Sequence, residues 1–392
     1  EVPIYVKETN NIADYIEFYA YANDGKLDTR LYNDPEWQMH DRYSMFSNSA
    51  VYYLTWNDVG GNLRINDLTN NLLNPPVKEA YFWETNSLIL NQTFSVGRPT
   101  YIGSSGNSTA LYNSLFDLGE GFFYNQQFNN SNSTLSFDLN TPNAISNIDA
   151  ELYSVLVSWS SNSHDFRIKS GSTVLSSHQF SGYSIEKHTD IIPASLVSPV
   201  TNVQYEAIPT SNGTNRNNPA LIEIRYARDF NMSNASSFIF DLEGNGSTQY
   251  LEFTNLDDQG SFPLLYDVSN GYRIAAIDAP GSNTHRFVLP PALGKRKLVI
   301  RADQSSTYNA VSSMQQLAFT NFNQAVNQGD YVILTGSAFF NTPEVNAYVS
   351  HRESTNGGSH NVVKVDINQL YDQFYYGVDK HPQSIRNFID FI

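Results

Sequence analysis

Residues 330–335, DYVILT, decide how the C-terminal part of the chain folds. A short and almost continuous apolar run of this kind is typical of a strand that is buried on both faces of a sheet. A second such run, NVVKVD, occupies residues 361–366. Because parallel strands have both faces covered by helices, the two runs predict a parallel sheet in this part of the chain.

Helical patterns separate and follow these two strands. Residues 342–344, TPE, predict a helix start with threonine as the cap and proline at the first helical position. We expect three apolar side chains of this helix to face the core: Val345, Tyr348 and Val349. Residues 367–374 predict a short helix, and residues 381–392 predict an amphipathic one. The order strand, helix, strand, helix is that of an α/β unit.

Two parallel strands with their helices cannot bury both faces of a sheet. We therefore expect the α/β domain to continue beyond Ile392 or to be completed by another chain. At the other end, residues 1–6, EVPIYV, resemble neither a signal peptide nor a start at an initiator methionine. A preceding segment is therefore expected as well.

Upstream of residue 321 the pattern is that of a β protein. Short runs of alternating apolar and aromatic residues, such as YIEFYA at 15–20 and AVYYLTW at 50–56, predict half-buried strands. Further strands are expected within residues 148–159 and 165–175, the second being a hairpin that turns at Ser-Gly-Ser, residues 170–172. Turn clusters at short intervals favour a sandwich or a jelly roll over a parallel sheet.

These patterns predict a mainly β fold. We expect two or three β-sandwich or jelly-roll-like domains, followed by the beginning of an α/β domain with a parallel sheet. The predicted boundaries are an N-terminal β domain at residues 1–145, a sandwich region of one or two domains at 146–320, and the first βαβα unit at 321–392. A chain of 392 residues is long enough for two or three domains.

Composition narrows the possible functions. The 39 acidic and 23 basic residues give a formal charge of -16, which repels nucleic acid and anionic bilayers and argues against nucleic acid as a partner. There is no cysteine, so these residues hold no disulfide, no thiolate metal site and no thiol nucleophile. No apolar run approaches the roughly 20 residues of a transmembrane helix. Abundant aromatic and amide side chains with few charges are typical of extracytoplasmic bacterial β domains.

Two groups of motifs resemble a known family. Near the start these are DYIEFYA at 14–20, NDGKLD at 23–28 and YSMFSNSAVYYLTW at 43–56. Near the end they are VVKVDINQLYDQF at 362–374 and GVDKHPQSIRNF at 377–388. In this order they resemble the N-terminal region of the PorU-like type IX secretion sortases of Bacteroidetes, which belong to the gingipain-like C25 cysteine peptidases. The resemblance spans essentially the whole chain, and the last motif is the more specific.

The resemblance implies a non-catalytic fragment of an enzyme. Such peptidases use a cysteine nucleophile and a histidine base on loops later in the domain, so no catalytic residue is assigned here, and whether the parent is active stays open. His381, which precedes a proline at a helix start, is interpreted as a cap and turn residue. The parent would process C-terminal sorting signals of secreted cargo at the outer membrane surface, with a β-barrel anchor of the PorV type as partner. This fragment would position and dock the peptidase domain.

One spacing resembles a calcium loop. Asp241, Glu243 and Asn245 alternate along the chain, and Glu252 falls where a bidentate carboxylate would lie. The third position is glutamate, and the flanks have strand patterns, which favours a plain hairpin over a calcium site. Calcium therefore remains the possible cofactor, and no other cofactor is expected.

Exposed tryptophans leave a second class of function open. Aromatic side chains in β domains can stack on sugars, and the candidates are Trp37, Trp56, Trp83 and Trp159. Core packing is the simpler reading for Trp56 and Trp159, whereas Trp37, in a polar loop, is the candidate for a partner contact. The alternative function is thus a cell-surface carbohydrate-binding or adhesion module. The basic run at 295–297, KRK, fits either an anion contact or a solvated turn, and the turn is favoured.

Overall fold

The computed structural model describes residues 1–10, 12–55, 60–98, 100–103, 109–111, 113–158, 160–211 and 215–392. The chain divides into two compact units. Unit 1 comprises residues 1–20, 56–112 and 117–310, and unit 2 comprises residues 21–55, 113–116 and 311–392. The chain thus passes from one unit to the other after residues 20, 55, 112, 116 and 310. The two units are described separately.

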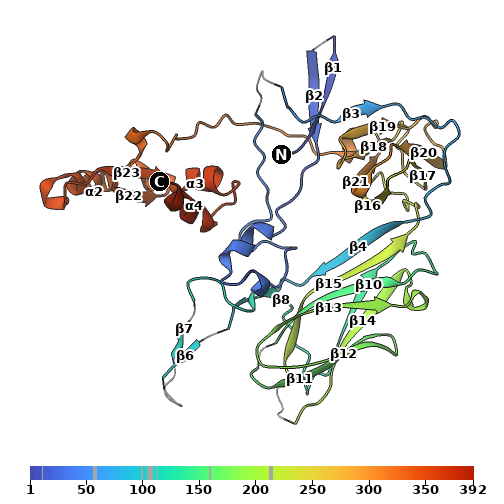
Figure 1. Ribbon diagram of the computed structural model, residues 1–392, viewed down its shortest axis with the longest axis horizontal. Helices are drawn as coiled ribbons and strands as arrows, with labels where there is room; N and C mark the ends of the chain where they lie inside the picture. Colours follow the sequence, from blue (N-terminus) through green and yellow to red (C-terminus); the bar gives the residue numbers. More distant parts are fainter. Residues whose placement is uncertain are drawn as a thin grey trace. The chain divides into compact units, whose positions relative to one another are not determined.

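Unit 1 is built on a long, mostly antiparallel sheet (Figure 1). In spatial order its strands are β13 (Ile185–Ile192), β10 (Ala150–Ser158), β15 (Asn217–Arg228), β4 (Phe82–Ile89), β16 (Ser237–Asn245), β21 (Leu293–Arg301), β18 (Leu264–Asp267), β19 (Tyr272–Ala275) and β3 (Asn66–Leu68). A shorter sheet has the order β12 (Thr173–Ser181), β11 (Ser163–Ser170), β14 (Val200–Ala207) and β9 (Thr134–Asn140). The predicted turn at 170–172 joins β11 to β12 and is confirmed.

Strand pairs complete unit 1. They are β1 (Ile4–Thr9) with β2 (Ile12–Phe18), β5 (Thr93–Val96) with β8 (Glu120–Phe123), β6 (Thr100–Ile102) with β7 (Thr109–Leu111), and β17 (Gln249–Thr254) with β20 (Thr284–Leu289). Short 3-10 helices lie at η3 (Ala194–Leu196) and η4 (Ser305–Thr307).

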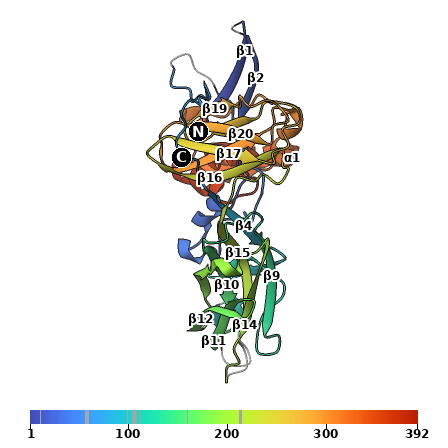
Figure 2. The ribbon, with the colours of Figure 1, turned by 90° about the vertical axis from the view of Figure 1, so that its right-hand side faces the viewer.

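Two hydrophobic cores lie against the long sheet. Figure 2 shows the strands that surround them, with β10, β11, β14 and β15 in one part of unit 1 and β16, β17 and β20 in the other. The first packs β9, β11 and β14 of the shorter sheet against β10 and β15, around side chains such as Phe166 and Tyr205. The second packs β17 and β20 against β16, β18 and β21, around Phe253 and Phe287. The two halves of the sheet meet where Asp241 of β16 pairs with Trp83 of β4. Unit 1 therefore consists of two sandwiches that share one sheet.

This arrangement differs from the predicted domain boundaries. Strand β9, from the region expected at 1–145, pairs with β14, and β4 from the same region pairs with β15. The reason is that strands far apart in the sequence pair within the same sheet. The positions of turns along the sequence do not reveal such pairings. The mainly β fold class is confirmed.

Unit 2 contains the predicted parallel strand pair. Strands β22 (Tyr331–Thr335) and β23 (Val362–Asp366) pair in parallel, as the two apolar runs predict. The helices are α1 (Ser337–Phe340), α2 (Pro343–Glu353), α3 (Ile367–Phe374) and α4 (Gln383–Phe391), with short 3-10 helices η1 (Lys26–Leu31), η2 (Pro35–Trp37), η5 (Ala325–Asn327) and η6 (Thr355–Gly357). Phe322, Val365, Leu370 and Phe388 form a small core between the sheet and helices α3 and α4.

Two local predictions for unit 2 are wrong. Helix α2 begins at Pro343 with Thr342 as its cap residue, but it buries none of its side chains, and Tyr348 is 47% exposed. Residues 50–55 form no strand, because no neighbouring strand pairs with them. Their apolar side chains make individual contacts instead. Within the described residues, no helix has the length and apolar character needed to cross a membrane.

Candidate functional site

A buried polar cluster in unit 2 joins residues 23–53 to the C-terminal helices. Its first part is η1, which follows Gly25 in the left-handed region at φ 89°. A Cβ at Gly25 would lie 2.5 Å from the carbonyl oxygen of Tyr43, so glycine allows the close approach of the two segments. This approach places Asp28 of η1 beside residues 44 and 45, where its side chain is fully buried.

Asp28 accepts two hydrogen bonds from nearby residues and has an imidazole from a distant part of the chain beside it. Its carboxylate accepts hydrogen bonds from the Ser44 hydroxyl, at 3.2 Å, and from the backbone N–H of Met45, at 2.7 Å. The Nε2 atom of His381 lies 3.3 Å from its Oδ1 atom. Asp28, Ser44 and His381 are each at most 3% exposed, so the cluster is closed to water.

A hydrogen bond and two aromatic neighbours fix the orientation of the His381 ring. Its Nδ1 atom accepts a hydrogen bond from the backbone N–H of Gln383, at 3.2 Å, which assigns the ring proton to Nε2, facing Asp28. Tyr375 stacks on the ring at a centroid distance of 4.1 Å, and Phe46 lies 4.6 Å away. His381 is therefore a turn residue just before α4, as predicted, but the N-cap of this helix is Pro382, and the buried acidic neighbour of His381 was not predicted.

Two tyrosines extend this cluster. The Tyr375 hydroxyl donates to the carbonyl oxygen of Leu27. Burial raises the pKa of Tyr375 to about 12, so it remains a donor at neutral pH. The Tyr53 hydroxyl donates to Asp372 at 2.7 Å, and its ring meets Phe319 edge-on at 5.9 Å. We call the set Leu27, Asp28, Ser44, Phe46, Tyr53, Asp372, Tyr375 and His381 the clamp.

The role of the clamp is to hold parts of the chain in position. A carboxylate, a hydroxyl and an imidazole are the groups of a hydrolytic triad, but here the hydroxyl of Ser44 bonds to Asp28, and burial leaves no access for a substrate. The chain also has no cysteine that could act as a nucleophile. The clamp therefore holds two segments of unit 2 together and does not form a catalytic centre.

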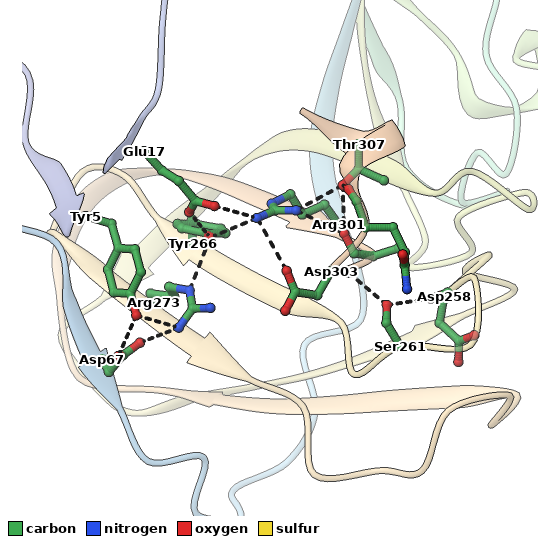
Figure 3. Close-up of polar contacts among 12 residues, drawn as sticks. Tyr5, Glu17, Asp67, Asp258, Ser261, Tyr266, Arg273, Arg301, Asp303 and Thr307 are labelled. Carbon is green, nitrogen blue, oxygen red and sulfur yellow. Dashed lines mark hydrogen bonds and ion pairs between the residues drawn. The ribbon is translucent and has the colours of Figure 1, made fainter. Parts of the chain in front are cut away.

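A second polar network fixes the N-terminal hairpin within unit 1 (Figure 3). Glu17 of β2 accepts hydrogen bonds from Arg301 of β21, at 3.0 Å, and from the Tyr266 hydroxyl, at 2.6 Å. On the same sheet, Arg273 donates to Asp67 at 2.7 Å, and its guanidinium lies 4.4 Å from the ring centroid of Tyr5. Glu17 belongs to the motif at 14–20, so this motif supplies a structural anchor.

Replacing Glu17 by alanine is expected to destabilise unit 1 by about 1–3 kcal/mol, because Arg301, which is 6% exposed, and Tyr266 each lose an acceptor. Hydrogen exchange of residues 4–18 should accelerate accordingly. Glu8→Ala, at an exposed position of the same hairpin, is the control and should change exchange little. Equal effects of the two substitutions would contradict an anchoring role.

The calcium-loop residues are not brought together. Asp241 pairs with Lys295 and Lys297, at 2.8 and 2.7 Å, and these lysines hold the pKa of its carboxyl below the ordinary value against the opposing effect of burial. Glu252 pairs instead with Lys78 at 2.8 Å. Glu243 and Asn245 belong to strand β16. Among the described residues, no three His, Asp or Glu side chains converge as a metal ion would require.

The basic run at 295–297 is neither a turn nor a free cationic patch. It lies within strand β21, so its side chains alternate. Arg296 points inward, is 1% exposed and pairs with the buried Asp267, with Nη2–Oδ2 at 2.5 Å. Lys295 and Lys297 point outward toward Asp241. The three basic side chains of this run thus pair with acidic side chains within unit 1.

Of the four tryptophan candidates, Trp37 of unit 2 and Trp83 of unit 1 lie within the described residues. Trp37 ends η2 and is half-buried, and it stays a prediction as a partner contact. The guanidinium of Arg225 lies 4.2 Å from the centroid of Trp83 and covers a face of that ring. Trp56 and Trp159 lie outside the described residues.

Comparisons with known proteins agree with this architecture. The sequence model of peptidase family C25 matches residues 324–392. Among solved structures, dimeric latent PorU from Porphyromonas gingivalis superimposes with a TM-score of 0.56 at 13% identity, covering 84% of this chain and 30% of that chain. The chain thus spans less than a third of the length of PorU. No curated protein sequence matches significantly.

A carbohydrate-binding domain is also similar over a smaller part. The CBM36-1 domain of a multidomain xylanase from the hindgut metagenome of Trinervitermes trinervoides gives a TM-score of 0.21 at 10% identity, covering 36% of this chain and 95% of that chain. A score of this size does not establish a common fold.

Proposed function

We propose that the chain is the N-terminal scaffold of a type IX secretion sortase-like cysteine peptidase, since residues 324–392 match the sequence model of peptidase family C25 and the chain is similar in fold to PorU. The scaffold is non-catalytic and positions the peptidase part. The whole protein would remove C-terminal sorting signals from secreted cargo at the outer membrane surface.

The clamp is the observation that carries this proposal. Residues 23–53 supply the carboxylate, the carbonyl and the aromatic ring that hold His381 and Tyr375, and these two lie in or beside the segment that matches family C25. The same N-terminal region contributes residues 1–20 to unit 1, where Glu17 anchors the hairpin. One stretch of chain is therefore built into both units, as a positioning element requires.

Composition supports the proposed location and partners. The absence of cysteine rules out a thiol nucleophile within these residues, so catalysis would lie elsewhere in the whole protein. The acidic charge and the large β content suit an extracytoplasmic position on the cell surface. A β-barrel anchor of the PorV type and cargo with C-terminal sorting domains are the proposed partners.

The proposal is tested in cells that carry the complete gene. Wild type and an Asp28→Ala variant are compared for the size of secreted cargo by immunoblot, with Asp24→Ala as the matched control, since Asp24 is exposed and pairs only locally with Lys26. We expect uncut cargo to accumulate in the Asp28 variant alone. Normal processing with a weakened clamp would contradict the scaffold role, and a wild-type protein that never cuts cargo would contradict the sortase assignment.

The anchor is tested by recovery from solubilised outer membranes. The 392-residue chain, immobilised through its N-terminus, is expected to retain a β-barrel protein. The Trp37→Ala variant measures whether the polar loop of η2 contributes to this contact. If no barrel protein is retained by wild type, the docking role is wrong, while the positioning role is judged separately by cargo processing.

A further inference from the structure

Strands β12 and β13 face each other, and the row of side chains that each turns toward the other is unusually polar. Strand β12 is at the end of the shorter sheet, and β13 is at the end of the long sheet. The less exposed row of β12 contains Ser176, His178 and Phe180. The corresponding row of β13 contains Glu186, His188 and Asp190. The edge of the first sandwich is therefore closed by ionisable side chains where apolar ones would ordinarily lie.

Two imidazole rings form the contact between these rows. The rings of His178 and His188 are stacked, with centroids 3.6 Å apart and planes inclined by 24°. Phe166 of β11 lies against both, at 5.1 Å from His178 and 5.8 Å from His188. The stacked pair thus connects one sheet of the sandwich to the other and borders its core.

The charged and titratable groups around the pair come from several strands. On β13, the Oε2 atom of Glu186 lies 3.4 Å from Nε2 of His188, and Asp190 is 8% exposed and acts electrostatically on His178. On β12, the hydroxyl of Ser176 is 2.8 Å from Nε2 of His178. The remaining titratable neighbours are His164 of β11, stacked on Phe180, and Tyr205 of β14, bonded to Ser154 of β10.

We propose that the stacked pair His178–His188 makes the edge between β12 and β13 an acid-sensitive seam. The seam is closed while at most one ring carries a charge. Glu186, with its Oε2 atom 3.4 Å from Nε2 of His188, compensates a positive charge on that ring. A second proton on His178 would place two positive rings 3.6 Å apart, and this repulsion separates the strands.

The direction of the pH effect follows from the protonation of His178. Burial and the neighbouring charge of His188 lower the pKa of His178 below the ordinary value. A histidine with a lowered pKa in the folded state stabilises the fold above the pKa of the unfolded chain, about 6.5, and this contribution is lost as pH falls toward the folded pKa. Acidification therefore opens the seam, and neutral pH closes it.

Hydrogen exchange followed by mass spectrometry tests the seam in the complete 392-residue chain. After correction for the intrinsic rate, exchange in residues 173–192 should accelerate by up to about tenfold between pH 6.5 and pH 5.5, because each pH unit below the unfolded pKa is worth at most one factor of ten. Strand β15, in the middle of the same sandwich, should not respond. Uniform acceleration over the whole of unit 1 would contradict a local seam.

Three variants separate the pair from its surroundings. His178→Phe keeps a ring for stacking but cannot be charged, so the acid response should disappear. His188→Phe removes the positive neighbour that helps lower the pKa of His178, so this pKa should rise toward its ordinary value and the acid response should become smaller. His351→Gln, at an exposed histidine of α2, should keep the full response. If His178→Phe and His188→Phe both respond as wild type does, the proposal is wrong. If one of them fails to fold, the other decides.

Discussion

An Asp28→Ala variant is expected to lose about 3–5 kcal/mol of the stability of unit 2, because Ser44 and Met45 lose their acceptor and the buried His381 loses its acidic neighbour. The Ser44 hydroxyl and the Nε2 atom of His381 would each be left without an acidic partner in a site that is closed to water. Hydrogen exchange of residues 375–391 and the urea midpoint of unit 2 measure the loss.

Two related variants make this result specific to the clamp. Asp24→Ala removes an exposed carboxylate from the same segment and should cost less than about 1 kcal/mol. Asp28→Asn keeps one acceptor oxygen and should fall between the two. If Asp28→Ala and Asp24→Ala destabilise unit 2 equally, the carboxylate of Asp28 does not hold the two segments together.

The second large effect is expected at the buried ion pair of unit 1. Asp267 and Arg296 are 0% and 1% exposed, with Nε–Oδ2 at 2.9 Å. Asp267→Asn leaves a buried guanidinium without a counter-charge, so a loss of about 3–5 kcal/mol is expected. Equilibrium unfolding in urea, read by hydrogen exchange in strands β18 and β21, measures it.

A double variant tests whether charge burial is the cause. Replacing both partners, as Asp267→Leu with Arg296→Met, removes the buried charges together and should cost less than the single Asp267→Asn substitution. The control is Asp241→Asn, whose lysine partners lie on the outer side of the same strand, with an expected loss below about 1 kcal/mol. A double variant that is weaker than the single one would show that shape and hydrogen bonds dominate.

Local elements of this fold are readable from the sequence, and long-range pairing is not. The apolar runs at 330–335 and 361–366 predict two buried strands, and the structure pairs them in parallel. The pairing of β9 with β14 has no local signal, because register between distant strands depends on which edges remain free after folding. The apolar and aromatic pattern of residues 50–55 does not produce a strand. Tyr53 instead makes individual contacts with Asp372 and Phe319.

The candidate site was predictable only in part. The His-Pro pair indicates a cap at the start of a helix, and Nδ1 of His381 does accept the N–H of Gln383. Its neighbour Asp28 lies in the short 3-10 helix η1 near the other end of the chain, where one more aspartate among many polar residues carries no signal. Arg296 is different, because Arg296, Leu298 and Ile300 alternate along the strand. That spacing would have placed the arginine on the buried face.

The clamp also has a consequence for how the chain is made. Leu27 and Tyr375, which it joins, are 348 residues apart, so residues 21–55 leave the ribosome long before the helices that bind them. Contacts of such separation form slowly, and the waiting segment exposes Phe46, Tyr52 and Tyr53 to other chains. The part of unit 2 that is synthesised first is thus the last to make its contacts, and we expect it to depend most on chaperones during synthesis.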